Sequence, residues 1–382
     1  MIVVGAAAGA TAVGWLLRRS LSSPVHRGIV QPDLDAFDFF ELTRRGYSGV
    51  YSVLIADRVV FRDRKRRYGR YWPVVLFAFS AWPCFVNIAL LLLQHPFAVS
   101  SPTSWTLLVA FSVLDALMLT AAWTAWTFGH RNSRHIDDML KDSPDRQEVG
   151  RWLAVRVSRK RQVVAPMVTA VSGSLFLYLT SAELSTWMDI GMASYLCLAW
   201  TTFLGGSVMY WLYVLPTIAR KLHGSRHLRL RSHDPAGTPA IRAFANGSAL
   251  AAFFLMAGVV TVLALTFWGP RLFAIPPLEI LITVVFTIYA VLGFRVGPYT
   301  YMWLYAIITR EKAENLGMIS RWIPPVSKMH EEYNEKAIEW VNLYQTLSSV
   351  PHLPFSTAAL VQYIAALLGA VVAFAIQQIA GS

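Results

Sequence analysis

One acidic residue lies in the middle of a long apolar run, where a charged side chain is energetically unfavourable. Asp115 is near the middle of the otherwise uncharged run LLVAFSVLDALMLTAAW. If this run crosses a bilayer, a charged carboxylate at its centre costs about 2.5–3.5 kcal/mol on insertion scales, so the side chain must face the interior of a helical bundle. Two interpretations follow. Asp115 is either a site that handles protons or cations, or a protonated acid whose hydrogen bond fixes helix packing.

Arg295 is the partner for Asp115 that charge alone would select. Counted from Leu278, Arg295 lies near the cytoplasmic end of an apolar run, where its long side chain can reach the interface. Depth therefore argues against a simple ion pair. Gly297 and Pro298 follow, and proline removes a backbone donor and disfavours helical geometry in the residue before it. We expect a helix break at Gly297-Pro298, which could admit water to the bundle.

Smaller polar features lie inside other apolar runs. They are Asn87, the triplet 172–174 (Ser-Gly-Ser), and the pair Gly205-Gly206. Each has two interpretations: a close contact between helices, or a local unwinding of the kind that forms binding sites in transporters. Helix packing is the more economical of the two.

Motifs for metal, nucleotide or cofactor chemistry are missing from the sequence. Three histidines share one loop: His223, His227 and His233. The six Lys and Arg residues of that loop would repel a divalent cation, so we predict no metal site. No Walker A loop, GxSxG elbow, HExxH or Rossmann glycine pattern occurs, and the two cysteines lie far apart. We predict no cofactor.

The composition is that of a membrane protein. Of 382 residues, 55% are hydrophobic and 15% charged, and the mean hydropathy is +0.45. A soluble domain of this length carries about a quarter charged residues, so the excess apolar side chains must face lipid. The net charge of +12 is concentrated beside apolar runs. This pattern indicates contact with anionic lipid, and we expect no nucleic-acid partner.

We predict an all-α, polytopic transmembrane bundle that forms one membrane-embedded domain over residues 1–382. It has eight spans, or seven if residues 1–17 do not insert. The approximate spans are 1–17, 72–93, 105–127, 163–181, 190–215, 244–268, 278–296 and 357–376. The cytoplasmic segments are 18–71, 128–162, 216–243 and 309–356.

The distribution of positive charge supports this topology. Of the 34 Lys and Arg residues, 32 lie in the four predicted cytoplasmic segments. Of the other two, Arg271 lies in an outer loop and Arg295 lies at an inner helix end. Basic segments stay on the cytoplasmic side, so we place the chain in the cell (plasma) membrane with its large basic loops inside.

One cytoplasmic segment, 329–349, predicts an amphipathic helix. Apolar residues recur there at helical spacing: Tyr333, Ala337, Trp340, Val341 and Tyr344. We expect this helix to dock on the bundle, on a protein partner or on a second copy of the chain.

Three function classes remain open. The first is a small-solute or ion/proton-coupled transporter, or a channel-like component, with Asp115 in its path. The alternative is a non-catalytic sensor, scaffold or effector that acts through its basic cytoplasmic loops. Least favoured is an intramembrane lipid-modifying enzyme, because only the pair Asp137-Asp138 offers clustered acids, and Arg131 and Arg134 nearby make that pair look like a solvated helix face.

Overall fold

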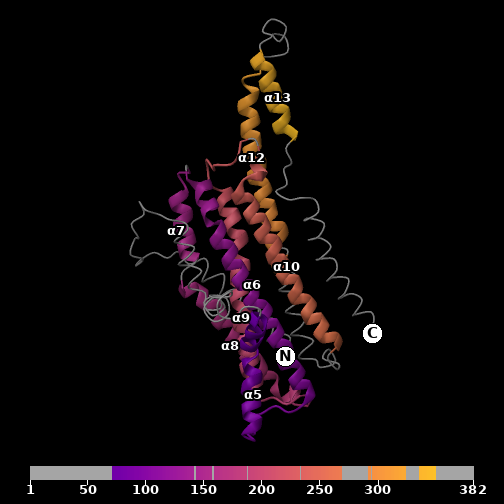
Figure 1. Ribbon diagram of the computed structural model, residues 1–382. Helices are drawn as coiled ribbons and strands as arrows, with labels where there is room; N and C mark the ends of the chain where they lie inside the picture. Colours follow the sequence, from indigo (N-terminus) through magenta and orange to yellow (C-terminus); the bar gives the residue numbers. More distant parts are fainter. Residues whose placement is uncertain are drawn as a thin grey trace.

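The computed structural model describes residues 71–141, 143–156, 159–186, 188–232, 234–268, 291–293, 295–323 and 335–349. In these residues the fold is all-α, as predicted, with nine α-helices (Figure 1). The α-helices are α4 (Trp72–Ser80), α5 (Trp82–Leu92), α6 (Pro102–Leu140), α7 (Arg146–Arg156), α8 (Arg159–Leu184), α9 (Met192–His223), α10 (Pro239–Trp268), α12 (Thr300–Ser320) and α13 (Glu335–Ser349). A 3-10 turn, η5 (Pro235–Gly237), and a π-helical turn, η7 (Arg295–Tyr299), complete the set.

Three to four of the described helical segments are long and apolar enough to cross a membrane. They are Pro102–Ala121 in α6, the segment Arg146–Leu184 that comprises α7 and α8, all of α9, and the bent pair α4–α5. They correspond to four of the predicted spans. α10 contains the predicted span 244–268, and its part Pro239–Leu255 is a shorter apolar helix. The predicted spans 1–17 and 357–376, and most of 278–296, lie outside the described residues.

The predicted span 72–93 consists of two helices rather than one. α4 ends at Ser80 and α5 begins at Trp82, and the two axes differ by 61°. Pro83 lies in the first turn of α5, where its missing N–H costs no intrahelical bond. The same ring would clash with the carbonyl four residues earlier in a continuous helix. The chain therefore restarts at Trp82.

An apolar stripe on α8 faces away from the protein. Its exposed residues recur every three or four positions: Val164, Met167, Val171, Leu175 and Leu179. The stripe extends over about 22 Å at 1.5 Å per residue. The other side of α8 packs closely on α9, where a Cβ on Gly206 would lie only 2.9 Å from Pro166 Cα. One helix face for lipid and one for protein is the arrangement expected of a membrane bundle.

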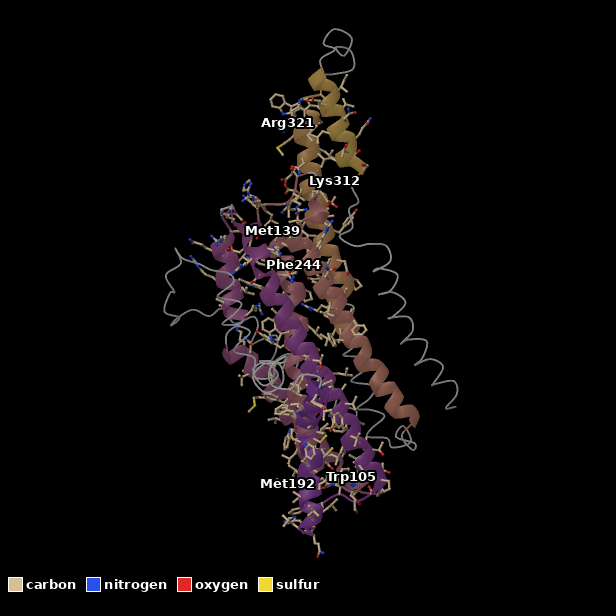
Figure 2. The ribbon with its side chains drawn as sticks, in the orientation of Figure 1. Trp105, Met139, Met192, Phe244, Lys312 and Arg321 are labelled. Atoms are coloured by element: carbon tan, nitrogen blue, oxygen red, sulfur yellow. The ribbon has the colours of Figure 1, made fainter. Side chains whose placement is uncertain are left out.

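The largest hydrophobic core in the described part of the chain lies at one end of the bundle. Fifteen buried residues form it, from the ends of α6 and α9, from α7, α10 and α12, and from the loop after α9. Figure 2 shows Met139 and Phe244 of this core at the end opposite Trp105 and Met192. We call the end with Met139 the inner end, following the predicted topology. Beyond it, α12 and α13 form a helical hairpin that extends past the other helices (Figure 1).

Ile307→Ala should destabilise the protein by about 2–5 kcal/mol, because the fully buried side chain would leave a cavity in the inner core. Thermal unfolding of the purified protein in detergent would measure the loss. The matched control is Met302→Ala on the same helix, where the side chain is 51% exposed and the expected change is within about 0.5 kcal/mol. Equal shifts for both variants would contradict the assignment of the core.

Candidate functional site

Asp115 lies within α6 and is completely buried. Its exposed fraction is 0%, and neither carboxyl oxygen has a hydrogen-bond partner among the described residues. α6 is fixed in place from its first turn, where the Ser101 side chain accepts a hydrogen bond from the backbone N–H of Ser104 and Pro102 starts the helix. A buried carboxyl without a partner is uncommon in proteins and marks a site that packing alone does not explain.

The polar neighbours of Asp115 come from α9. The Thr201 hydroxyl interacts with the Asp115 carboxyl at a geometry short of a full hydrogen bond, and the Cys197 thiol lies within the range of the carboxyl's charge; the two residues are 6% and 2% exposed. The Thr201 hydroxyl also has no formed hydrogen bond among the described residues. Thr201 and Cys197 are four positions apart and so share one face of α9. α9 thus offers Asp115 a hydroxyl and a thiol.

Weakly polar side chains continue from Asp115 toward the outer end. Ser112 lies one turn before Asp115 on α6, and its Oγ is 3.5 Å from Cys84 Sγ on α5. Cys84 and Cys197 belong to the same buried cluster, together with Ala81 at the bend between α4 and α5. We call Cys84, Ser112, Asp115, Cys197 and Thr201 the polar seam.

Toward the inner end the surroundings of Asp115 are apolar. Buried side chains from α4, α6 and α9 form one cluster: Leu76, Leu114, Met118, Leu119 and Leu204. We call this cluster the inner plug. Cys84 meets α6 on the outer side of the Ala81 bend, and Leu76 meets it on the inner side. Asp115 therefore lies at the level of the bend, with the polar seam on one side and the inner plug on the other.

Asn87, a predicted polar site residue, contacts the outer loop. Its side-chain amide donates to the carbonyl of Val99 at 2.9 Å and accepts from the N–H of Val99 at 2.8 Å. The N–H and the oxygen of this buried side-chain amide thus both form hydrogen bonds with the backbone of Val99. Asn87 fixes the extended loop that leads into α6.

Asp189 adds a second attachment for the same loop. One of its carboxylate oxygens accepts hydrogen bonds from the N–H of Ser100 (3.0 Å) and of Ser101 (2.7 Å), and from the Ser100 hydroxyl (3.1 Å). Gly191 nearby packs directly against Phe97 O, where no Cβ would fit. These contacts tie the loop before α6 to the loop before α9. We call them, with Asn87, the outer clamp.

Arg295 lies far from Asp115. Its guanidinium is 4.2 Å from the ring centroid of Tyr213 on α9 and 5.6 Å from that of Tyr299. Tyr213 follows Thr201 by twelve residues on one continuous helix, which is about 18 Å along its axis. The structure therefore does not bring the two predicted site residues together.

The predicted helix breaks have different local structures. Gly297 and Pro298 lie in the π-helical turn η7, and this turn leads directly into α12. Gly205 and Gly206 lie within the regular helix α9. A Cβ on Gly205 would lie 3.7 Å from Met118 Sδ of α6, and Gly206 lets α8 approach. This pair serves helix contacts on two faces of α9.

Other candidate groups do not converge on a site. Asp137 pairs with Arg146, with Nη2–Oδ1 at 2.8 Å, while Asp138 is exposed. His223 packs on the Trp303 ring at 4.9 Å between centroids. Among the described residues, no three His, Cys, Asp or Glu side chains are placed to hold a metal ion.

Sequence reasoning missed two parts of the site, the bend at Ala81 and the α9 residues Cys197 and Thr201. The Trp82-Pro83 pair is a signal for the bend. Nothing in the sequence shows which face of α9 meets α6, because that depends on tertiary packing. Comparison of the chain with models of known families, with curated proteins and with solved structures finds no match.

The outer clamp should respond to acid. The N–H groups of Ser100 and Ser101 hold the pKa of Asp189 below its usual range, because they stabilise the charged carboxylate. This stabilisation is complete above the unfolded pKa of about 3.9 and is lost as the pH falls through the lower folded value. We expect the amide hydrogens of Ser100 and Ser101 to lose protection below about pH 4, measured by hydrogen exchange.

Asp189→Asn should remove this pH dependence. The control is Glu183→Gln, which changes another exposed acid at the outer end. Protection that stays constant down to pH 2 in the unaltered protein would contradict the role of Asp189.

Proposed function

We propose that this protein is a small-solute or ion/proton-coupled transporter, or a channel-like component, of the cell membrane, with Asp115 as its proton-binding group. The observation that carries the proposal is the complete burial of a carboxyl that interacts with the Thr201 hydroxyl of α9 but forms no hydrogen bond of full geometry with any described residue. An acid that served only to fix packing is expected to form such a bond with a neighbouring helix. An unsatisfied carboxyl in a membrane bundle is instead typical of a group that binds and releases a charge.

The surroundings of Asp115 are more polar on one side than on the other. Toward the outer end the polar seam gives Asp115 weakly polar neighbours within a buried cluster that also holds Val99 and Leu108, whereas the inner plug consists of leucine and methionine side chains. Helix α4–α5 bends by 61° at the same level. Broken helices near the middle of the membrane are a recurrent feature of transporter binding sites.

The proton suits this site better than a metal cation. Hard cations take six or more oxygen ligands. Around Asp115 the described side chains supply one carboxyl and the Thr201 and Ser112 hydroxyls, and the Ser112 hydroxyl already donates to Leu108 O. The remaining members of the polar seam are thiols, which are poor ligands for such ions.

The helical hairpin favours a second candidate, a sensor or scaffold that acts by self-association. α13 lies within the predicted helix 329–349, and residues 329–334 lie outside the described part of the chain. Leu347 of α13 is 3% exposed, and Trp340 stacks on Trp322, just beyond the end of α12, at 6.3 Å between ring centroids. Met318 in the last turn of α12 and Trp322 nevertheless remain 55% and 68% exposed. A second copy of the hairpin would cover these two side chains.

Asp115→Asn should abolish proton-coupled flux in proteoliposomes, because an amide has the same shape but cannot exchange a proton at neutral pH. The measurement is the change in pH of the vesicle lumen when each of a set of candidate solutes is added. The matched control is Asp138→Asn, an exposed acid on the same helix, which should leave flux unchanged. Flux at the unaltered rate in the Asp115 variant would refute the proposed mechanism.

The double variant Met318→Ser, Trp322→Ser should turn a self-associated protein into monomers, because it removes the two exposed apolar side chains at the end of α12 and just beyond it. Light scattering of the purified full chain in detergent would give the mass. Gln345→Ser, a polar change on α13, is the control. A monomeric unaltered protein would exclude self-association through the hairpin.

A further inference from the structure

Two arginines and three aromatic rings form a continuous series along the inner half of α9, the turn η7 and the first turn of α12. The Arg295 guanidinium lies over the Tyr213 and Tyr299 rings, and the Tyr299 ring meets Trp303 edge to face at 5.8 Å between centroids. The Arg220 guanidinium lies 5.7 Å from the centroid of Trp303. We call Tyr213, Arg220, Arg295, Tyr299 and Trp303 the cation–aromatic ladder.

Neither arginine of the ladder is neutralised by the described residues. The described ion pairs use Arg146, Lys221 and Arg242, and none includes Arg220 or Arg295. Arg295 Nε is buried and has no hydrogen-bond partner in the same part of the chain. Aromatic rings contact the face of each guanidinium but accept none of its in-plane N–H groups. Arg295 Nε is therefore an oriented donor that no described residue uses, and Arg220 is exposed.

The ladder lies where apolar helices give way to the basic inner end. Arg220 is in the last turn of α9, and Trp303 is in the first turn of α12. Tyrosine and tryptophan are enriched at this depth in membrane proteins because they suit the headgroup region. Arginine binds phosphate through two parallel N–H groups and stacks on aromatic rings, which lysine does not do as well.

We propose that the cation–aromatic ladder binds the phosphate of an anionic phospholipid headgroup in the inner leaflet. Arg295 donates to the phosphate oxygens, and Arg220 at the other end of the ladder adds a second positive charge on the headgroup side. Tyr213, Tyr299 and Trp303 hold the guanidinium planes in place. The site lies at a different level from Asp115 and does not depend on the transport proposed for that residue.

The test uses the purified full chain in neutral detergent, titrated with phosphatidylglycerol or with phosphatidylcholine. Phosphatidylglycerol should raise the unfolding temperature, and phosphatidylcholine should not. Arg295→Gln should weaken the apparent affinity for phosphatidylglycerol by about 10-fold, the effect of losing one charge-assisted hydrogen bond, and Arg220→Gln should weaken it by a smaller factor. Arg321→Gln, an exposed arginine at the end of α12, is the control and should bind as before.

Equal stabilisation of the unaltered protein and the double variant Arg220→Gln, Arg295→Gln would overturn the site. Inorganic phosphate at millimolar concentration is a separate arm, and stabilisation equal to that by phosphatidylglycerol would assign the ladder to a soluble anion instead. Native mass spectrometry gives a second readout that does not require the variants to be equally stable. The double variant should carry one phosphatidylglycerol fewer per chain, and an unchanged count would also overturn the proposal.

Discussion

The close contact of α8 with α9 is the interaction on which the other helices depend. In lipid, the hydrophobic effect does little to drive helices together. Helix association therefore depends on van der Waals and polar contacts, which require the backbones to approach closely. Gly206 and Gly173 permit this approach, because a Cβ at either position would collide with α8 or α9 side chains. With one face on α8, α9 is left to present Cys197 and Thr201 to α6, and Tyr213 to η7.

The inner end is stabilised by a different kind of packing from that of the apolar helices. Fully buried leucines and isoleucines there resemble the core of a soluble domain, and polar contacts link the surrounding loops. Arg310 of α12 donates to His223 O at 2.8 Å and Ser225 O at 2.9 Å, which satisfies carbonyls at the end of α9. The end of α9 therefore belongs both to the apolar helices and to the inner core. α9 connects the buried carboxyl to the inner core through one rigid element.

Apolar length and charge bias were enough to predict the helical class and the position of four apolar segments, because each signal is local. The local structure around each proline could not be predicted in this way. Pro83 follows a sharp bend, Pro298 lies in a π-helical turn, and Pro166 and Pro216 lie inside continuous helices. The residue is the same each time, and the outcome depends on what packs beside it. The burial of Asp115 follows from its depth, but its α9 neighbours follow only from the tertiary fold.

The outer clamp has a mechanical consequence. Asn87 joins the middle of α5 to the loop before α6, and Asp189 joins that loop to the segment before α9. The outer ends of three helices are thus one rigid frame. Separating these ends would break the contacts of the clamp. The bend at Ala81 lies between this frame and α4, which packs on α6 and α9 through Leu76 of the inner plug.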